Sequence, residues 1–373
     1  MPENTRKRLN YADMMKGLAV AMVVVYHTVA PGSIKSFTEH MGDVMLATFF
    51  FYSGYFYNVG KKSFGSNVAA RAKALLIPFF GYSFLFWLIG TIYLVVTGQA
   101  PLPECLACLR NFYGGCIWNT DIQNIFGWEY YKLGSRYIFL ADLWFLPAMM
   151  FASILFFAIA DFVLKNRTVA CLTVFILFAV TGVFCAMKTT LAYNVHLVPF
   201  WAGIMLTGTW CRQGRVIETD KLSGKAHVAL AAISTVMGIA VAMLKGPATN
   251  LFRGSFGTSF DDPQIQAMLL SVLDSALVIW GMSTICIMAE NKGIRTKELV
   301  WLGRNSMSIY VYHMFFAWVI SRVMGFSLKY EEPVSMSSLI LSLIFAVVCL
   351  GLCAGAHVLK SRVKGRLARD SFF

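Results

Sequence analysis

The sequence has few charged residues, and few of those are acidic. Only 14% of its 373 residues are charged, against 58% that are hydrophobic, and 32 basic residues stand against 19 acidic ones. A soluble domain carries about 25% charged residues, so this chain has more apolar surface than one soluble core of its length can bury. Lipid is the natural solvent for the excess. Composition therefore argues against an ordinary soluble protein and predicts an integral membrane protein in contact with the lipid bilayer.

The sequence also lacks a nucleic-acid-binding pattern. Such a surface needs Lys and Arg on one folded face with aromatic residues between them, whereas here the basic residues fall in short breaks between apolar runs. The net charge of +13 therefore reflects membrane topology, and no nucleic-acid partner is expected.

A metal-binding pattern is missing as well. Most of the nine cysteines lie singly in or beside apolar runs and are small buried hydrophobes. Cys105, Cys108 and Cys116 share one polar stretch, but no nearby His completes a set of four zinc ligands. No metal is expected, and whether these three cysteines form a disulfide stays open.

Apolar stretches of about 20 residues, the length that spans a bilayer, recur along the chain. They cover 12–30, 42–58, 74–97, 141–164, 168–187, 193–211, 226–245, 266–289, 305–324 and 336–359. We therefore predict an all-α bundle of about ten transmembrane helices, forming a single domain over residues 1–373. Lys16 and His27 interrupt the first stretch, so we predict a retained helix there rather than a cleaved signal peptide.

Lys and Arg in alternate breaks predict the orientation. They are concentrated at 6–8, 61–73, 165–167, 212–225, 292–304 and 360–369, and are sparse in the other breaks. Cytoplasmic loops carry such an excess, so both termini are predicted to be cytoplasmic, and 98–140 becomes a long extracytoplasmic loop. The Trp, Tyr and Asn residues of that loop suit sugar binding or an interfacial aromatic belt, and both interpretations stay open.

The first predicted helix carries polar residues that a membrane interior accepts only with a partner or a cavity. Asp13 and Lys16 lie three residues apart and can pair. Lys16 and His27 lie eleven apart, so one stripe of the helix carries both, about 16 Å from each other. A ligand with an anionic head and a distant reactive end, such as a CoA thioester, fits this stripe. A snorkelling lysine and a structural histidine explain the same residues.

The second and third predicted helices add further candidates. Gly54 permits close helix packing, and Ser53 can bond across helices, although a Ser together with a distant His also suggests a nucleophile. Arg71 and Lys73 lie at the cytoplasmic end of the third helix. They suit phosphate groups and ordinary membrane anchoring equally well.

Polar groups on the fourth, sixth and ninth predicted helices complete the set. Asp142 lies at the outer end of the fourth, the side to which His27 points, where it could orient an imidazole, bind an acceptor hydroxyl or cap the helix. His196 lies on the sixth. Asn305 caps the ninth at its inner end, and His313 lies about 12 Å further along it. Three histidines on separate helices that face a common interior suggest a site.

Several segments carry motifs that resemble, in order, those of the acyltransferase-3 family of integral membrane acyltransferases. They are Asp13–Ala19 with Val23–His27, Phe50–Tyr55, Arg71–Pro78, Leu143–Leu146 with Trp144 inside it, and Gly303–His313. Most members are bacterial enzymes that O-acetylate envelope sugars. The resemblance implies that His27 is the catalytic histidine, that Lys16 helps to hold CoA, and that Arg71 lies near the cytoplasmic CoA mouth.

The resemblance also implies a donor, an acceptor and a place. The donor is cytosolic acyl-CoA, with acetyl-CoA as the default, and the acceptor is a carbohydrate or lipid-linked glycan outside the cell (inner) membrane. The family often has Arg where this chain has Lys16, and Lys keeps the charge but loses bidentate phosphate binding, which fits a subgroup. The alternative is a transporter or flippase, which predicts inverted repeats that the sequence does not show.

Overall fold

Helices are the only regular elements in the part of the chain that the structure describes. This computed structural model describes residues 9–27, 37–113, 140, 142–187, 191–218, 224–245, 263–324 and 336–370. The longer helices are α1 (Asn10–His27), α3 (Gly42–Tyr55), α4 (Phe64–Val96), α8 (Phe145–Val163), α9 (Arg167–Ala186), α10 (Val198–Gln213), α11 (Gly224–Lys245), α13 (Pro263–Asn291), α15 (Ser306–Met324) and α16 (Met336–Asp370).

A helix occupies each of the predicted apolar stretches. Among the described residues, six helices are long and apolar enough to cross a membrane: α4, α8, α9, α11, α13 and α16. The helices α3 and α10 have only 14 and 16 residues, and α1 and α15 are likewise not among the six. The all-α membrane fold is therefore confirmed, while the number of crossings stays a prediction.

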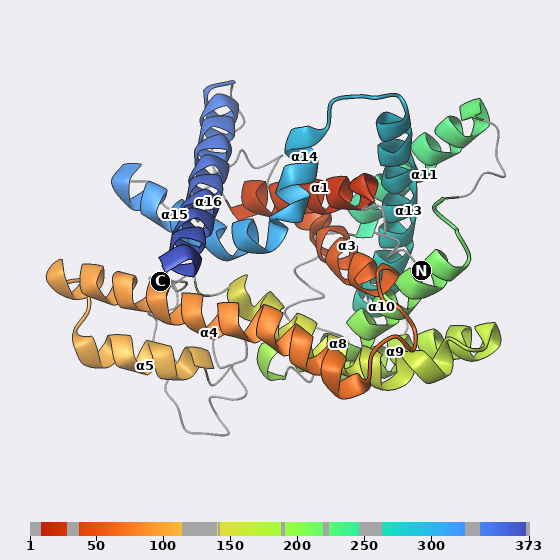
Figure 1. The fold of residues 1–373 in the computed structure, drawn as a ribbon, viewed down its shortest axis with the longest axis horizontal. Helices are drawn as coiled ribbons and strands as arrows, with labels where there is room; N and C mark the ends of the chain where they lie inside the picture. The colour runs from red at the N-terminus through yellow and green to blue at the C-terminus, as the bar shows by residue number, and fades with distance from the viewer. Residues whose placement is uncertain are drawn as a thin grey trace.

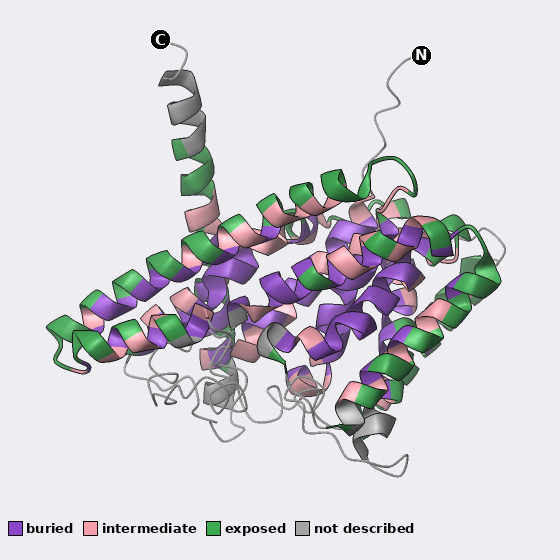
Figure 2. Ribbon diagram, turned by 90° about the horizontal axis from the view of Figure 1, so that it is seen from below, coloured by how far each residue is buried: buried purple, intermediate pink, exposed green. Residues whose placement is uncertain are grey.

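The helix α1 lies at the centre of the bundle, where it contacts α3, α13, α15 and the short helix α14 (Lys297–Arg304) (Figure 1). Its neighbours enclose it on several sides, so Ala12 and Val20 are fully buried. By contrast, α4 exposes an apolar row that includes Ile77, Phe84 and Ile92, the surface that lipid would cover. Figure 2 shows this contrast between buried central helices and exposed outer ones.

Glycines allow the central helices to approach closely. A Cβ added at Gly303 of α14 would lie 1.6 Å from the carbonyl oxygen of Asp13 in α1, and one at Gly54 of α3 would lie 1.9 Å from that of Met205 in α10. Such distances exclude any side chain, so the backbones themselves are in contact. The close packing that the sequence suggested at Gly54 is confirmed, and the contact at Gly303 fixes α1 against α14.

One face of the bundle gathers alternate helix ends, and we call it the basic face. Asn10 at the start of α1 donates to Glu290 near the end of α13 at 2.9 Å. Tyr57, just after α3, donates to Asp161 near the end of α8 at 2.7 Å. Tyr55 is the last residue of α3, Lys61 lies in the segment that follows α3, and Arg212 lies in the last turn of α10. All three line one cavity at this face. Helices that cross the membrane in alternating directions would bring these helix ends to one side. Which side is cytoplasmic stays a prediction.

The predicted 98–140 loop begins with a helix. α5 (Leu102–Tyr113) packs along α4 (Figure 1), and Trp87 of α4 donates its indole N–H to the Cys105 carbonyl oxygen at 2.9 Å. Cys105 and Cys108 are buried free thiols on α5. Residues 114–139, with Cys116 and most of the aromatic residues of the loop, lie outside the described residues.

Candidate active site

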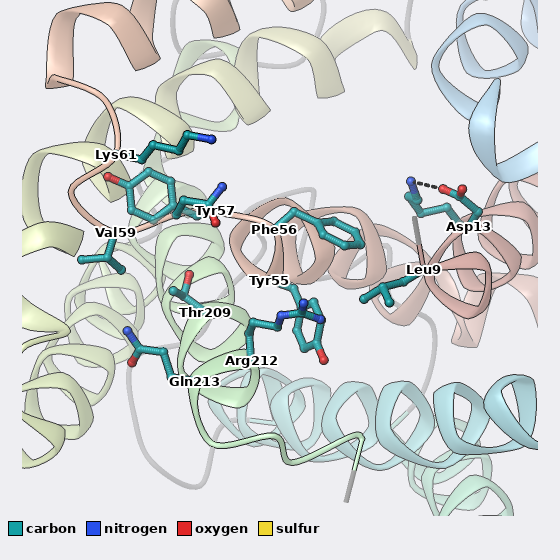
Figure 3. A pocket seen from close by; sticks show the side chains of 12 residues that line it. Leu9, Asp13, Tyr55, Phe56, Tyr57, Val59, Lys61, Thr209, Arg212 and Gln213 are labelled. Atoms are coloured by element: carbon teal, nitrogen blue, oxygen red, sulfur yellow. Dashed lines mark ion pairs between the residues drawn. The ribbon is translucent and has the colours of Figure 1, made fainter. Parts of the chain in front are cut away.

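A cavity of ≈ 930 Å³ opens at the basic face between α1, α3 and α10. Lys16, Lys61 and Arg212 are the cations that line it, and Asp13 is its acidic residue. Figure 3 shows Arg212 and Tyr55 on one wall and Lys61 on another. The full lining is Leu9, Asp13, Lys16, Tyr55, Phe56, Tyr57, Asn58, Val59, Lys61, Thr209, Arg212 and Gln213. A cavity with this excess of positive charge suits a large anionic ligand.

Arg212 is held in place at the wall of this cavity. Its Nη1 lies 3.2 Å from the Glu218 carboxylate, and its guanidinium lies 5.2 Å from the centre of the Tyr55 ring. Tyr11 donates its hydroxyl to Glu218 at 2.9 Å. Sequence reasoning placed Arg212 only among the topology-setting charges, because its partners come from other parts of the chain and no local motif marks it.

Lys16 lies at the junction of this cavity with a second one. Its Nζ lies 2.8 Å from Asp13 Oδ1, which confirms the predicted pair, and Asp13 Oδ2 lies 3.3 Å from Arg304 Nε on α14. Because one carboxylate serves two cations, positive charge remains uncompensated at this point. Lys16 Nζ also lies 6.0 Å from the centre of the Phe56 ring, and both residues line both cavities.

The second cavity is smaller, ≈ 320 Å³, and leads between α1, α3, α4, α8 and α15. Arg71 lines it and donates to Ser53 Oγ, another lining residue. The other lining residues are mostly apolar and aromatic: Phe49, Tyr52, Phe56, Phe145, Met149, Met307 and Tyr310, with Lys16 and Ser306. Lys73 is exposed and lines neither cavity. The sequence predicted a phosphate-binding role for Arg71 and Lys73 equally, but in the structure only Arg71 lines a cavity.

Two predicted histidines come together beyond the second cavity. Tyr310 lines that cavity, and its ring centre lies 5.5 Å from that of His313. The His313 ring lies 5.2 Å from the ring of His27 at the end of α1. His313 Nδ1 lies 2.6 Å from the Tyr310 carbonyl oxygen, and because a carbonyl oxygen only accepts, Nδ1 is the donor in this contact.

His196 does not join this pair among the described residues. It lies buried in the 3₁₀ helix η3 (Ala192–Leu197). Its Nδ1 accepts the backbone N–H of Leu191 at 3.2 Å, and it makes no ring contact with His27 or His313 in the described ranges. The structure thus brings together two of the three histidines that the sequence grouped.

The remaining candidates occupy helix ends. Asn305 follows α14 and donates its side-chain amide to the Trp301 carbonyl oxygen at 2.8 Å, so its observed role is to close α14. Asp142 opens the 3₁₀ helix η2 (Asp142–Trp144), and its side chain lies outside the described residues. Trp144 packs edge-on against Phe145, 6.2 Å between ring centres, next to the second cavity.

Three comparisons with known proteins bear on the family of this chain. The model of a protein family, described as an acyltransferase domain, matches residues 9–357. No curated protein and no solved structure matches the chain. The matched range includes both cavities and the histidine pair and nearly the whole chain. The protein therefore belongs to the acyltransferase-3 family of membrane acyltransferases.

Proposed function

We propose that this protein is an acyl-CoA-dependent O-acyltransferase of the cell membrane. It moves an acyl group, acetyl by default, from cytosolic acyl-CoA to a hydroxyl of an envelope carbohydrate or lipid-linked glycan. The observation that carries the proposal is the arrangement along α1. Lys16 stands at the junction of two cavities, and His27, on the same helix, belongs to a histidine pair reached through Tyr310.

The shapes of the two cavities support CoA as the donor. CoA has a bulky head with several phosphates, an extended arm and a terminal thioester. The larger cavity offers Lys16, Lys61 and Arg212 to the phosphates, and the smaller, more apolar one suits the arm. Arg71, which lines the smaller cavity, adds a further cation. Under this proposal the basic face is the cytoplasmic face, which agrees with the excess of Lys and Arg there.

His27 is the proposed catalytic group, with His313 as its positioning residue. In direct transfer His27 accepts the proton of the acceptor hydroxyl while that oxygen bonds to the thioester carbon. The carbon–sulfur bond then breaks, and the thiolate takes the proton from the imidazolium and leaves as free CoA. Asp142, near the acceptor end, is proposed to orient His27 or to bind the acceptor hydroxyl.

A covalent relay is the second route for the same residues. The His27 nitrogen bonds to the acyl carbon, and the thiolate leaves on the donor side and takes up a proton there. The acceptor oxygen then bonds to the acyl carbon, the carbon–nitrogen bond to His27 breaks, and the released imidazole nitrogen takes the hydroxyl proton. The two routes differ in one observable: only the relay labels the protein itself when acetyl-labelled CoA is supplied without an acceptor.

The test is turnover of acetyl-labelled CoA by purified protein with a panel of glycan and lipid-linked sugar acceptors. We expect wild type to release free CoA and to form a labelled ester. His27→Ala should lose turnover but keep binding of a non-cleavable CoA thioether. His357→Ala is the matched control, because His357 lies 5.9 Å from the Trp301 ring and lines neither cavity, and it should behave as wild type.

Two results would count against the proposal. A wild-type rate in His27→Ala would remove His27 from the chemistry. Absence of both CoA binding and turnover in folded wild-type protein, across several acyl-CoAs and acceptors, would favour the transporter alternative.

A further inference from the structure

A cluster of three charged side chains lies away from both cavities. Lys245 Nζ pairs with Oδ2 of Asp43 and with Oδ2 of Asp274, and it donates to Ser271 Oγ at 3.3 Å. The three charged side chains are at most 1% exposed, and none lines either cavity. We call Asp43, Lys245 and Asp274 the buried ion cluster.

The cluster joins three helices at the end opposite the basic face. Asp43 lies in the first turn of α3, Lys245 is the last residue of α11, and Asp274 lies within α13. In the sequence, Lys245 ends the apolar stretch 226–245 in the way a solvated residue would, but in the structure its side chain is buried. The side chain folds into the protein, because two carboxylates from other helices receive it.

The depth of the cluster is close to that of the histidine pair. Beside it, Met41, Val44, Ala242 and Val278 form a small apolar cluster against which Met22 of α1 packs. Of these, Ala242 and Val278 lie about one turn nearer the basic face than Lys245 and Asp274. His27 lies five residues beyond Met22, about 7.5 Å further along α1. The buried ion cluster therefore lies in the same half of the bundle as His27.

The charges of the cluster do not balance. Two ionised carboxylates and one ammonium leave one negative charge, and among the described residues no second cation pairs with Asp43 or Asp274. A buried, uncompensated charge costs several kcal/mol, and a carboxyl group in this position binds a proton instead. Among the described residues, the other titratable side chains on neighbouring elements at this end include Glu39 and His40 before α3 and Tyr26 and His27 on α1.

The surroundings of the two carboxylates differ. Asp43 Oδ1 accepts the backbone N–H of Val44 at 3.0 Å, at a helix N-terminus that favours negative charge. Asp274 lies in the interior of α13, and its Oδ1 accepts only the Ser275 hydroxyl at 3.2 Å among the contacts described. The proton is therefore held chiefly on Asp274.

We propose that the buried ion cluster is a proton-binding site. One proton, held on the carboxylate of Asp274, makes the cluster neutral and keeps α3, α11 and α13 together at this end. Loss of the proton leaves a buried negative charge and loosens the three helices. The site is independent of the acyl chemistry proposed above, and its test needs neither donor nor acceptor.

The test combines infrared spectroscopy with thermal unfolding of the full chain in detergent over a range of pH. Wild type should show the carbonyl band of a buried carboxylic acid. Its melting temperature should fall as pH rises through the titration of that band, because the proton stabilises the folded state and is lost at high pH. Asp274→Asn makes the cluster neutral without a proton, so it should lack the band and its melting temperature should lose that dependence.

Matched variants distinguish the effect of the bound proton on stability from the effect of altered side-chain packing. Lys245→Met leaves two carboxylates without a cation, and it should lower the melting temperature most at high pH. Asp161→Asn changes a carboxylate at the basic face that accepts from Tyr57, and it should keep the band and the wild-type pH profile. If Asp274→Asn fails to fold, Asp43→Asn tests the same charge balance.

The proposal is overturned if wild type shows no buried carboxylic acid band at any pH. It is equally overturned if Asp274→Asn and Asp43→Asn keep the band and the pH profile of wild type. A melting temperature that depends on sodium concentration and not on pH would assign the missing positive charge to a metal cation and contradict the proton site.

Discussion

Lys16 is the residue on which donor binding depends in the function proposed above. Among the described residues it is the cation that lines both cavities, and it keeps 21% of its side chain exposed, so a ligand can reach it. Arg304 shares the Asp13 carboxylate, so Asp13 keeps a cationic partner when Lys16 is replaced. A change in donor affinity on replacing Lys16 therefore reports the loss of its contact with the ligand, because Asp13 is not left without a cationic partner.

We predict that Lys16→Met raises the KM for acetyl-CoA and leaves kcat close to that of wild type. The loss of a charge-assisted contact to phosphate is worth about 1.5–3 kcal/mol, or roughly tenfold to a hundredfold in KM. Lys16→Arg keeps the charge and should retain most of the affinity. Steady-state kinetics with varied acetyl-CoA measures both.

Lys73→Met is the control for Lys16→Met. Lys73 lies on α4 two residues after Arg71 but is exposed and lines neither cavity, so its replacement should leave KM unchanged. Equal increases in KM for the two variants would mean that the general positive charge of the face matters and that Lys16 has no particular contact with the donor.

Sequence alone predicted some of these residues and missed others for a physical reason. Spacing on one helix placed Asp13 beside Lys16 and set His27 on the same stripe. Arg212 depends on partners from other elements, so local spacing carried no signal for it. In the buried ion cluster, Lys245 ends an apolar run like a solvated residue, and Asp274, a charge inside a predicted span, was the signal that could have found the cluster.

At the scale of elements, the contact between α1 and α14 positions Lys16 and the carboxylate that it shares with Arg304. We predict that Gly303→Ala destabilises the protein, because the new Cβ would lie 1.6 Å from the Asp13 carbonyl oxygen and would push the two backbones apart. Overpacking of this kind costs about 1–3 kcal/mol. A lowered melting temperature in detergent, followed by tryptophan fluorescence, is the expected result.

Gly351→Ala on α16 is the matched substitution. No atom lies within 4 Å of a Cβ at that position, and Ala favours a helix over Gly by about 1 kcal/mol, so stability should stay equal or rise. Similar melting temperatures for the two variants would show that α1 and α14 are not held by a backbone contact at Gly303.

The helices themselves were largely predictable, because apolar runs of membrane-spanning length mark them. Their limits were less so. α4 begins at Phe64, ten residues before the predicted span, where the Ser63 side chain accepts the backbone N–H of Ser66 at 3.4 Å and caps it. α5 was missed, because a helix of 12 residues is too short for a spanning pattern and its buried cysteines looked like loop residues.

At the scale of the whole molecule, we expect alternate crossings to place the two ends of α4 on opposite sides of the membrane. Lys62 lies just before α4 and Thr97 just after it, and both are exposed. We predict that a membrane-impermeant maleimide labels Thr97→Cys in intact cells, and labels Lys62→Cys only after the membrane is opened. The chain without these substitutions measures the background labelling of its own cysteines, including the exposed Cys171. The reverse pattern would invert the topology.

The most direct measurement is acyl transfer across a membrane of known orientation. The protein is reconstituted in vesicles, its orientation is fixed by labelling Lys62→Cys, and acetyl-labelled CoA is supplied on one side at a time with sugar acceptors on both sides. If the donor enters at Lys16 and the transfer occurs at His27, free CoA appears only when acetyl-CoA faces the basic face, and labelled ester accumulates in the opposite compartment. Ester formed only on the donor side, or equal turnover from both sides, would contradict the arrangement along α1.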